Sequence, residues 1–258
     1  MTVSGTNFGK AAEDYGTFRA GFPESIFDRL AEFRVGLPEH TVIDLGTGTG
    51  SLARGFALRG CKVTGVDADP RMIDQAKKLD RESEVSIRYV EAKAESTGLD
   101  SGVADVVTAG QCWHWFDQPL AIAEVIRLLK PSGNLVIANF DWLPLDGNVV
   151  EATEELIMHY NPNWQFGGGI GMYPHYLPAL SEAGMQIIQT FSYDMDVPNA
   201  PEAWRGRIRA SAGVAALEAD SARKFDSDLL GLLSRRFPSS VLEVPHRVFA
   251  IVAEAANQ

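Results

Sequence analysis

The stretch that decides the fold is TVIDLGTGTG, residues 41–50. Its first five residues are mostly β-branched or apolar, which predicts a short buried strand. The three glycines that follow let the backbone turn sharply and come close to a ligand. Residues 51–59 then have the apolar spacing of a helix, and Gly60 is a suitable C-cap. A strand, a glycine-rich turn and a helix in this order are typical of a loop that binds a nucleotide-like cofactor.

The spacing of the glycines indicates a cofactor without a pyrophosphate. Dinucleotide-binding loops favour GxGxxG, with the pyrophosphate at the helix N-terminus. Here Gly46, Gly48 and Gly50 follow GxGxG instead. Asp44, just before the loop, would repel phosphates but suits a cationic end of a ligand.

A second acid supports the same interpretation. Asp67 follows the next predicted strand, residues 62–66, where an acidic side chain can accept hydrogen bonds from ribose hydroxyls. The alternative is a tight turn between strand and helix without a ligand, in which Asp69 and Pro70 only begin the next helix. That alternative explains Asp69-Pro70 but gives Asp67 no role beside the glycine loop.

Strands and helices alternate along the chain, which predicts an α/β fold with a mostly parallel sheet and helices on both faces. Up to residue 140, helices are expected from Pro23 to Pro38, from Asp69-Pro70 onward and at 118–130, strands near 85–90, 104–109 and 135–139, and a turn at 131–133. Beyond residue 140, helices are expected at 146–160, 173–183, 200–212 and 218–237, and strands at 185–197 and 244–253. We interpret residues 1–258 as a single domain, with an N-terminal segment (1–36), a cofactor-binding core (37–140), and substrate-side helices plus the last two strands (141–258).

Composition and charge narrow the possible partners. The formal net charge is −11, whereas proteins that bind nucleic acid usually present a basic face, so no nucleic-acid partner is expected. The two cysteines predict neither a disulfide framework nor a zinc site. No signal peptide and no run of about 20 apolar residues is evident, so we expect a cytoplasmic protein without a membrane partner.

Five ordered segments carry a family resemblance: VIDLGTGTG (42–50), VTGVDADPRMI (63–73), EAKAESTGLDSGVADVV (91–107), QCWHWFD (111–117) and EVIRLLKPSGNLVI (124–137). In this order they resemble the motifs of class I S-adenosylmethionine-dependent methyltransferases. The resemblance implies a Rossmann-like, seven-stranded sheet that ends in a reversed hairpin of the last two strands. It also implies S-adenosyl-L-methionine as cofactor and S-adenosyl-L-homocysteine as product.

The resemblance further implies which residues contact the cofactor. Asp67 would bind the ribose, Met72 would pack on the adenine, and Ala94 and Glu95 would lie at the adenine edge. The position that often holds an Asp for the adenine amino group is Lys93 here, so the role of the Glu95 side chain stays open. The full set of expected cofactor contacts is Tyr15, Asp44, Gly46, Thr47, Gly48, Asp67, Ala68, Met72, Ala94, Glu95 and Gln111. Tyr15 belongs to an aromatic N-terminal segment that is similar to the lid helix of such enzymes.

The segment after the fourth strand is the candidate acceptor side. It places His114 at the carboxyl edge of the sheet, where the methyl group should point, and histidine titrates near neutrality. In small-molecule O-methyltransferases of this family a base histidine follows an Ala-Asp pair at about the spacing of Ala104-Asp105 to His114, which favours oxygen as acceptor. Alternatively, His114 only helps the chain to turn, and both interpretations have equal weight. Asp117 is expected to be a helix N-cap.

The acceptor is expected to be a small molecule, bound to a monomer or homodimer without a metal. Aromatic and histidine side chains of the second half suggest an apolar-aromatic pocket (Trp142, His159, Trp164, Tyr173, His175, Tyr176). The substrate-binding residues that we select are Trp113, Trp142, Tyr173, His175 and Arg209, the arginine as an anchor for a carboxylate. Three alternatives stay open: carbon or nitrogen methylation on the same scaffold, a non-catalytic S-adenosylmethionine-binding module, and a nicotinamide oxidoreductase, which the glycine spacing and Asp44 disfavour.

Overall fold

The computed structural model describes residues 21–256. Its strands are β1 (Thr41–Leu45), β2 (Lys62–Asp67), β3 (Arg88–Glu91), β4 (Ala104–Gly110), β5 (Leu129–Trp142), β6 (Gln186–Asn199) and β7 (Leu242–Glu254). Its helices are α2 (Glu24–Glu32), α3 (Ser51–Leu58), α4 (Pro70–Glu82), α5 (Gln118–Leu128), α6 (Val149–Tyr160), α7 (Leu177–Glu182), α8 (Pro201–Arg209), α9 (Ala212–Ala215) and α10 (Ala219–Arg236), with short 3-10 turns η2 (Trp113–Trp115) and η3 (Pro174–Tyr176). The predicted N-terminal lid, including Tyr15, lies outside the described residues.

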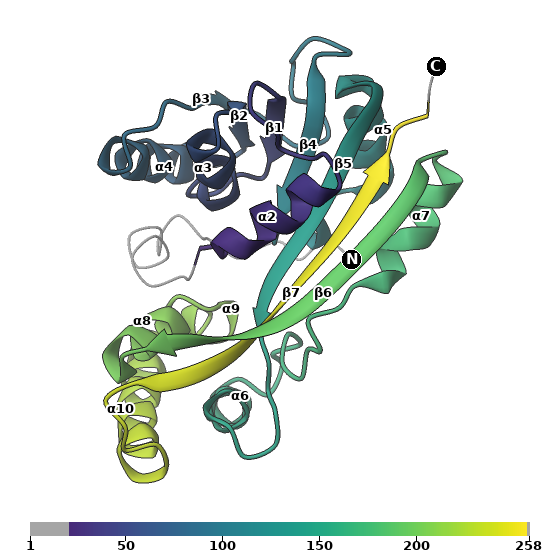
Figure 1. Cartoon of the computed structure of the whole chain (residues 1–258). Coiled ribbons are helices and arrows are strands. Elements are labelled where there is room, and N and C mark those ends of the chain that lie inside the picture. The colour runs from purple at the N-terminus through teal and green to yellow at the C-terminus, as the bar shows by residue number, and fades with distance from the viewer. Residues whose placement is uncertain (1–20, 257–258) are drawn as a thin grey trace. The chain divides into compact units, whose positions relative to one another are not determined.

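The strands form one sheet in the order β3-β2-β1-β4-β5-β7-β6 (Figure 1). The pairs β1–β2, β1–β4, β2–β3 and β4–β5 are all parallel. β7 runs antiparallel to β5, since Ala255 N donates to Gly133 O and Leu143 N donates to Pro245 O. The predicted seven-stranded, mostly parallel sheet with reversed C-terminal strands is therefore confirmed.

Helices cover both faces of the sheet, as predicted. α3 packs on β1 and β2, and α2 packs on α3 through an edge-to-face pair of Phe27 and Phe56 with ring centroids 5.0 Å apart. α5 packs on β4 from the opposite face and also contacts α7 (Figure 1). These layers leave the carboxyl ends of β1, β2 and β4 at one edge, where ligands of such sheets bind.

The predicted turn at 131–133 is wrong, because the segment is an irregular part of β5. β5 begins at Leu129, which pairs with Ala104 of β4, and the register then shifts before Val106. Ser132 takes up the irregularity with a left-handed φ of 57°. Helix α5 consequently ends at Leu128, two residues before the predicted end, because Leu129 is already extended and pairs with Ala104 of β4.

Two other predicted elements are shorter in the structure. The expected helix 173–183 is a 3-10 turn followed by α7, and Pro178 lies in the first turn of α7, where a missing N–H costs nothing. The expected strand 85–90 begins only at Arg88, because Val85 N still donates to Asp80 O at the end of α4. In both cases the local backbone hydrogen bonds, rather than the apolar pattern, set the boundary.

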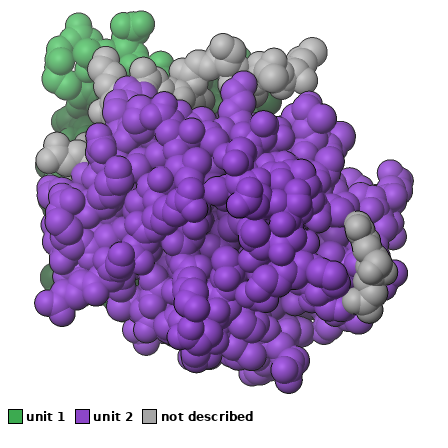
Figure 2. Space-filling view, turned by 90° about the horizontal axis from the view of Figure 1, so that it is seen from above, with its two compact units in different colours: residues 1–20, 141–172, 193–247 green, residues 21–140, 173–192, 248–258 purple. Residues whose placement is uncertain are grey.

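The chain folds into two compact units, which Figure 2 shows in different colours. The glycine-loop unit holds residues 21–140, 173–192 and 248 onward, and the helical unit holds residues 141–172 and 193–247 among those described. β5, β6 and β7 each continue from one unit into the other. The single-domain interpretation stays a prediction. Within residues 21–256, no helix combines the length and the apolar character that crossing a membrane requires.

Each unit has its own buried core. In the glycine-loop unit, apolar residues of β1, β4, β5 and β7 pack with those of α5 and α7, and Trp113 and Tyr176 belong to the same cluster. In the helical unit, α6, α8 and α10 pack around Trp204 and Phe225, both fully buried. Among the candidate site residues, Trp113 therefore belongs to the first core, and Trp142 packs against the second.

Candidate functional site

The glycine loop has the backbone that its sequence predicts. Gly46, Gly48 and Gly50 have φ angles of 62°, 55° and 78°, a left-handed region that residues with a side chain rarely adopt. A Cβ at Gly46 would lie 2.8 Å from Cys112 Sγ, so the loop packs closely against the segment that follows β4. A Cβ at Gly48 would lie 3.4 Å from Met72 Cε, which brings the predicted adenine-packing residue next to the loop.

Asp44 lies at the carboxyl end of β1 and is almost completely buried, with 1% of its surface exposed. Thr108 Oγ1 donates to one carboxylate oxygen at 2.6 Å and Thr47 Oγ1 donates to the other at 2.7 Å. Burial raises the pKa of Asp44 to about 6, although both hydroxyls favour the ionised form. The hydroxyls of Thr47 and Thr108 therefore hold the Asp44 carboxylate in place beside the loop.

Asp67 ends β2 and reaches back to the glycine loop. One carboxylate oxygen accepts from Gly48 N at 2.8 Å, and the other accepts from Asp69 N at 2.9 Å. Burial raises the pKa of Asp67, while these two backbone N–H groups lower it. Ala68 lies next to it and is exposed. The loop itself therefore holds Asp67, the residue predicted to bind the ribose, in place.

The segment predicted to lie at the adenine edge is tied to both sides of the site. Ala92 N donates to Asp67 O at 3.0 Å, and Ala94 is buried. Glu95 accepts a hydrogen bond from Asp117 N at 2.9 Å, so its side chain fixes the segment that carries His114. This contact gives the Glu95 carboxylate a positioning role that its sequence position left open.

The predicted acceptor segment forms a tight turn after β4. Gln111 has a left-handed φ of 57°, its N donates to Ala138 O at 2.8 Å, and its side-chain amide donates to Phe140 O. Trp113 is buried in the core, whereas His114 is exposed and its ring centroid lies 4.6 Å from that of Trp115. The turn therefore presents the imidazole of His114 at the surface of the glycine-loop unit.

Asp117 ends this turn as the N-cap of α5. Its side chain accepts from Leu120 N at 3.3 Å. The predicted capping role is confirmed, and this residue needs no catalytic role to explain it.

Tyr173 and His175 lie together in the glycine-loop unit. The ring of Tyr173 stacks on Tyr176 with centroids 5.7 Å apart, lies 6.0 Å from the ring of His175 and 6.1 Å from that of Phe249. Tyr173 also packs against the core cluster that contains Trp113. Three of the predicted substrate-binding residues thus belong to one unit.

Trp142 and Arg209 lie in the helical unit, and both already have protein partners. Trp142 Nε1 donates to Glu154 Oε1 at 2.8 Å, and the Arg207 guanidinium lies 5.0 Å from the Trp142 ring. Arg209 forms ion pairs with Asp226 at 3.0 Å and with Glu202 at 3.5 Å. A substrate carboxylate would have to compete with these two acids for Arg209.

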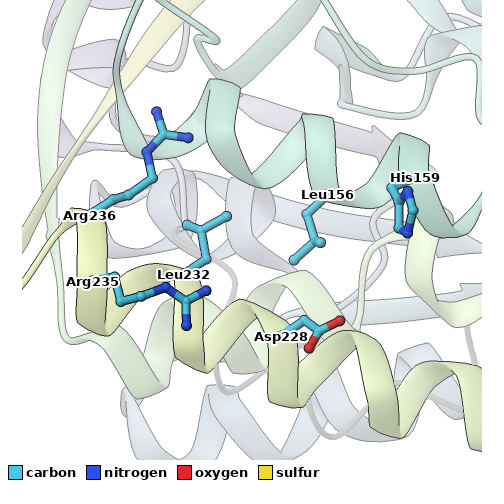
Figure 3. A pocket seen from close by; sticks show the side chains of 6 residues that line it. All are labelled: Leu156, His159, Asp228, Leu232, Arg235 and Arg236. Atoms are coloured by element: carbon cyan, nitrogen blue, oxygen red, sulfur yellow. The ribbon is translucent and has the colours of Figure 1, made fainter.

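The helical unit also contains a pocket of about 380 Å³ between α6 and α10. Figure 3 shows Leu156 and Leu232 in its middle, with arginines at one end and His159 and Asp228 at the other. The arginines are Arg235 and Arg236. Of the residues expected to form an aromatic pocket, only His159 lines it.

Thr108 is a residue of the candidate site that sequence reasoning missed. It is fully buried on β4, where the pattern reads as a continuous apolar strand with one hydroxyl in it. A polar residue in the middle of a buried strand is a signal that could have found it, because such a group needs a hydrogen-bond partner. Its partner is Asp44, 64 residues earlier in the sequence.

Comparisons with known proteins agree with this geometry. Residues 43–137 match a family described as a methyltransferase domain. An uncharacterised methyltransferase of Mycobacterium tuberculosis is 34% identical over 129 residues, 50% of this chain and 50% of the relative. A ubiquinone biosynthesis O-methyltransferase of Xanthomonas campestris is 28% identical over 184 residues, 69% of this chain and 74% of the relative. The chain spans about half the length of the mycobacterial relatives that it matches.

A solved structure shares the fold over nearly the whole chain. The structure of a putative type II methyltransferase from Anaeromyxobacter dehalogenans superposes with a TM-score of 0.64 and is 20% identical, covering 93% of this chain and 98% of the other. The match over residues 43–137 and the shared fold support a class I S-adenosylmethionine-dependent methyltransferase domain in this part of the chain.

Proposed function

We propose that this chain is an enzyme that transfers the methyl group of S-adenosylmethionine to a hydroxyl or carboxylate oxygen of a small molecule, releasing S-adenosylhomocysteine. The observation that carries this proposal is the contact between the glycine loop and the turn that holds His114. A Cβ at Gly46 would lie 2.8 Å from Cys112 Sγ and 3.0 Å from Phe116 Cζ. The candidate donor loop and the candidate base are therefore neighbours within one unit.

The residues around the loop fit the proposed donor. The bare backbone at Gly48 leaves space that a side chain would occupy, between the loop and Met72. An ionised carboxylate offers roughly four acceptor sites, and Asp67 uses two of them, so the ribose hydroxyls can donate to the others. The buried charge of Asp44 favours a cationic ligand end at the loop. When bound, this cofactor supplies an electrophilic methyl group on a sulfonium.

His114 is the proposed general base. A hydroxyl acceptor must lose its proton as the new bond forms, and a neutral imidazole can accept that proton. The tight turn from Gln111 onward and the capped start of α5 hold His114 between two fixed points. We propose that Trp113, Tyr173 and His175 orient the acceptor, because holding it in line with the methyl group is a large part of catalysis.

Two further observations support oxygen as the acceptor atom. The spacing from Ala104-Asp105 to His114 is similar to that of O-methyltransferases with a base histidine. A ubiquinone biosynthesis O-methyltransferase is also among the relatives.

The direct test is a transfer assay with methyl-labelled S-adenosylmethionine and three panels of acceptors: phenols, carboxylic acids and primary amines. Label in aryl ethers or methyl esters is the expected result. Label on nitrogen or carbon would contradict oxygen as the acceptor atom and would identify the enzyme as an N- or C-methyltransferase. Binding of S-adenosylhomocysteine without any transfer would indicate a non-catalytic module.

The role of His114 is tested separately, by the transfer rate of the variant His114→Ala at neutral pH. His114→Ala should lower the rate with a phenol acceptor by about a hundredfold at neutral pH, because general-base catalysis typically contributes that much. The matched control is His159→Ala, another exposed histidine, which lies in the helical unit. Full turnover of His114→Ala at neutral pH would remove the proposed base.

A further inference from the structure

Behind the glycine loop, three side chains from three different elements form one partly buried network of hydrogen bonds. Arg54 comes from α3, Asp80 from α4 and Tyr89 from β3. Arg54 Nε donates to Asp80 Oδ1 at 3.1 Å, and Tyr89 Oη donates to Asp80 Oδ2 at 2.8 Å. The side chains of Arg54 and Asp80 are only 14% and 7% exposed, so this ion pair is well shielded from water.

Arg54, at one end of this hydrogen-bond network, also bonds the backbone of the loop. Arg54 Nη2 donates to Thr49 O at 2.8 Å, and Thr49 lies between Gly48 and Gly50. The same nitrogen donates to Ala76 O at 3.3 Å, which ties the loop to α4 as well. A guanidinium has several donors in a fixed plane, so one side chain can fix the loop carbonyl and an acid together.

Two glycines make room for this arrangement. A Cβ at Gly50 would lie 2.7 Å from Tyr89 Oη, and a Cβ at Gly65 would lie 2.7 Å from Tyr89 Cε1 and 3.0 Å from Thr47 Cγ2. The Tyr89 ring thus packs on bare backbone on the side of β2 that faces the loop. Burial and the bond to Asp80 raise the pKa of Tyr89, so the phenol stays a donor.

We infer that Arg54, Asp80 and Tyr89 form a loop clamp that positions the methyl donor. By holding the Thr49 carbonyl, Arg54 sets the Thr49–Gly50 peptide plane, next to two glycines whose flexible backbone would otherwise sample many conformations. A loop held in its binding conformation loses less entropy when the ligand binds. None of the three side chains need touch the ligand, so all three are positioning residues. This inference rests on the proposed donor site at the glycine loop.

The clamp should matter most for the part of the donor that lies on the loop. S-adenosylhomocysteine carries the amino acid end, whereas 5′-methylthioadenosine has only the nucleoside part with a methylthio group. The nucleoside is expected at Asp67, which stands at the end of β2 and is fixed by Asp69 N in addition to the loop. Loss of the clamp should therefore weaken S-adenosylhomocysteine more than 5′-methylthioadenosine.

The test is calorimetric titration of the full chain with both ligands, at a temperature well below the midpoint of thermal unfolding of each variant. Arg54→Met should raise the Kd of S-adenosylhomocysteine by about tenfold, the loss expected when a hydrogen bond to a charged group is removed. The Kd of 5′-methylthioadenosine should change by less than about threefold, which is below 1 kcal/mol. The Kd of Arg54→Lys for S-adenosylhomocysteine should lie between those of wild type and Arg54→Met, because an ammonium can replace one of the lost bonds.

Arg59→Met is the matched control. Arg59 lies one residue beyond α3, contacts Gly55 O and Glu24 O, and covers the Phe27 ring at 4.5 Å, so its loss removes comparable contacts away from the loop. It should lower the midpoint of thermal unfolding without changing the Kd of S-adenosylhomocysteine. If that Kd rose equally in Arg54→Met and Arg59→Met, Arg54 would contribute only to the stability of the fold, and the inference would be overturned.

Other outcomes are equally decisive. An unchanged ratio of the two Kd values in Arg54→Met would overturn the inference. If that variant does not fold, Tyr89→Phe decides the question, because it keeps the ring on Gly65 and removes only the bond to Asp80. Its Kd ratio should shift in the same direction, and no shift would contradict the clamp. Failure of the wild-type chain to bind S-adenosylhomocysteine would instead overturn the proposed donor site.

Discussion

The glycine-loop unit and the helical unit use their buried polar groups in opposite ways. In the glycine-loop unit, the carboxylates of Asp44 and Asp67 accept from hydroxyls and backbone N–H groups, so their negative charge is kept at the loop. In the helical unit, Arg209 is paired with Asp226, and the buried Arg207 lies 3.0 Å from the ring nitrogen of His246. The two carboxylates beside the glycine loop therefore keep a negative charge without a cationic partner in these contacts, whereas the charged groups of the helical unit named here pair with protein groups.

The largest expected effect tests whether the loop backbone is the binding element. Gly46→Ala requires a left-handed alanine and places its Cβ 2.8 Å from Cys112 Sγ. We expect the affinity for S-adenosylhomocysteine to fall by about a hundredfold or more, which corresponds to about 3 kcal/mol of backbone strain and steric overlap. Titration calorimetry measures the change.

Gly102→Ala is the matched control for this change. Gly102 has a similar φ of 65°, but a Cβ there would have nothing within 4 Å. It should cost about 1 kcal/mol of stability and leave the affinity intact. Equal losses of affinity in both variants would show that only folding is affected.

The second prediction uses pH, because the two units should respond to acid in opposite directions. Burial, and then the charge of Arg207, lower the pKa of His246 to about 3. Since this is below its unfolded value, the folded state resists protonation, and stability is lost as pH falls from about 6.5 towards 3. Burial raises the pKa of Asp44 to about 6, so its folded state takes up a proton first, and stability is gained as pH falls from about 6 towards 4.

Chemical denaturation near pH 7 and near pH 5 separates these contributions, if wild type is compared with His246→Gln and Asp44→Asn. Relative to His246→Gln, the free energy of unfolding of wild type should fall by about 2 kcal/mol on going to the lower pH. Relative to Asp44→Asn, it should gain about 1 kcal/mol. The same sign in both comparisons would remove the contrast between the units.

A smaller effect is expected at Asn139 of β5, in the glycine-loop unit. Its side chain is 4% exposed, and its Oδ1 has no hydrogen-bond partner among the described residues. Asn139→Leu has nearly the same shape and should raise the free energy of unfolding by about 1 kcal/mol, because a buried acceptor without a partner is costly. Thermal denaturation measures this, and a decrease in stability would mean that the amide is satisfied in solution.

The smallest effect is expected at Arg209 of the helical unit. Its ion pairs with Asp226 and Glu202 are partly exposed, with the three side chains 33%, 23% and 65% exposed. Arg209→Gln should therefore cost less than about 1 kcal/mol of stability and leave the KM for a carboxylic acid acceptor unchanged. A rise in that KM at constant kcat would restore Arg209 as the carboxylate anchor and would weaken the contrast between the units.

The fold could be predicted where apolar period and turn chemistry agree. The strand at 41–45, the cap at Asp69 and the cap at Asp117 all occur as predicted, since each depends on neighbours in sequence. The boundaries at 85–90 and 131–133 could not be predicted, because they depend on a backbone bond to Asp80 and on the register between β4 and β5. Such pairings join residues that local patterns do not relate.

The candidate site divides in the same way. Left-handed glycines and an acid after a strand are local signals, and they indicated the loop and Asp67. The pairing of Thr108 with Asp44 and the clamp from Tyr89 to Thr49 join elements far apart in sequence, so no local pattern identifies the partners, although a hydroxyl in a buried strand signals that Thr108 needs one. The ion pair of Arg209 with Asp226, which joins α8 to α10, was missed for the same reason.

The decisive measurement is calorimetric titration of wild type and Asp67→Ala with S-adenosylhomocysteine, and of wild type with NAD. A donor site at the glycine loop predicts one S-adenosylhomocysteine per chain, an affinity at least about tenfold weaker in Asp67→Ala, and no binding of NAD. Tight binding of NAD, or an Asp67→Ala variant that binds S-adenosylhomocysteine as well as wild type does, would contradict it.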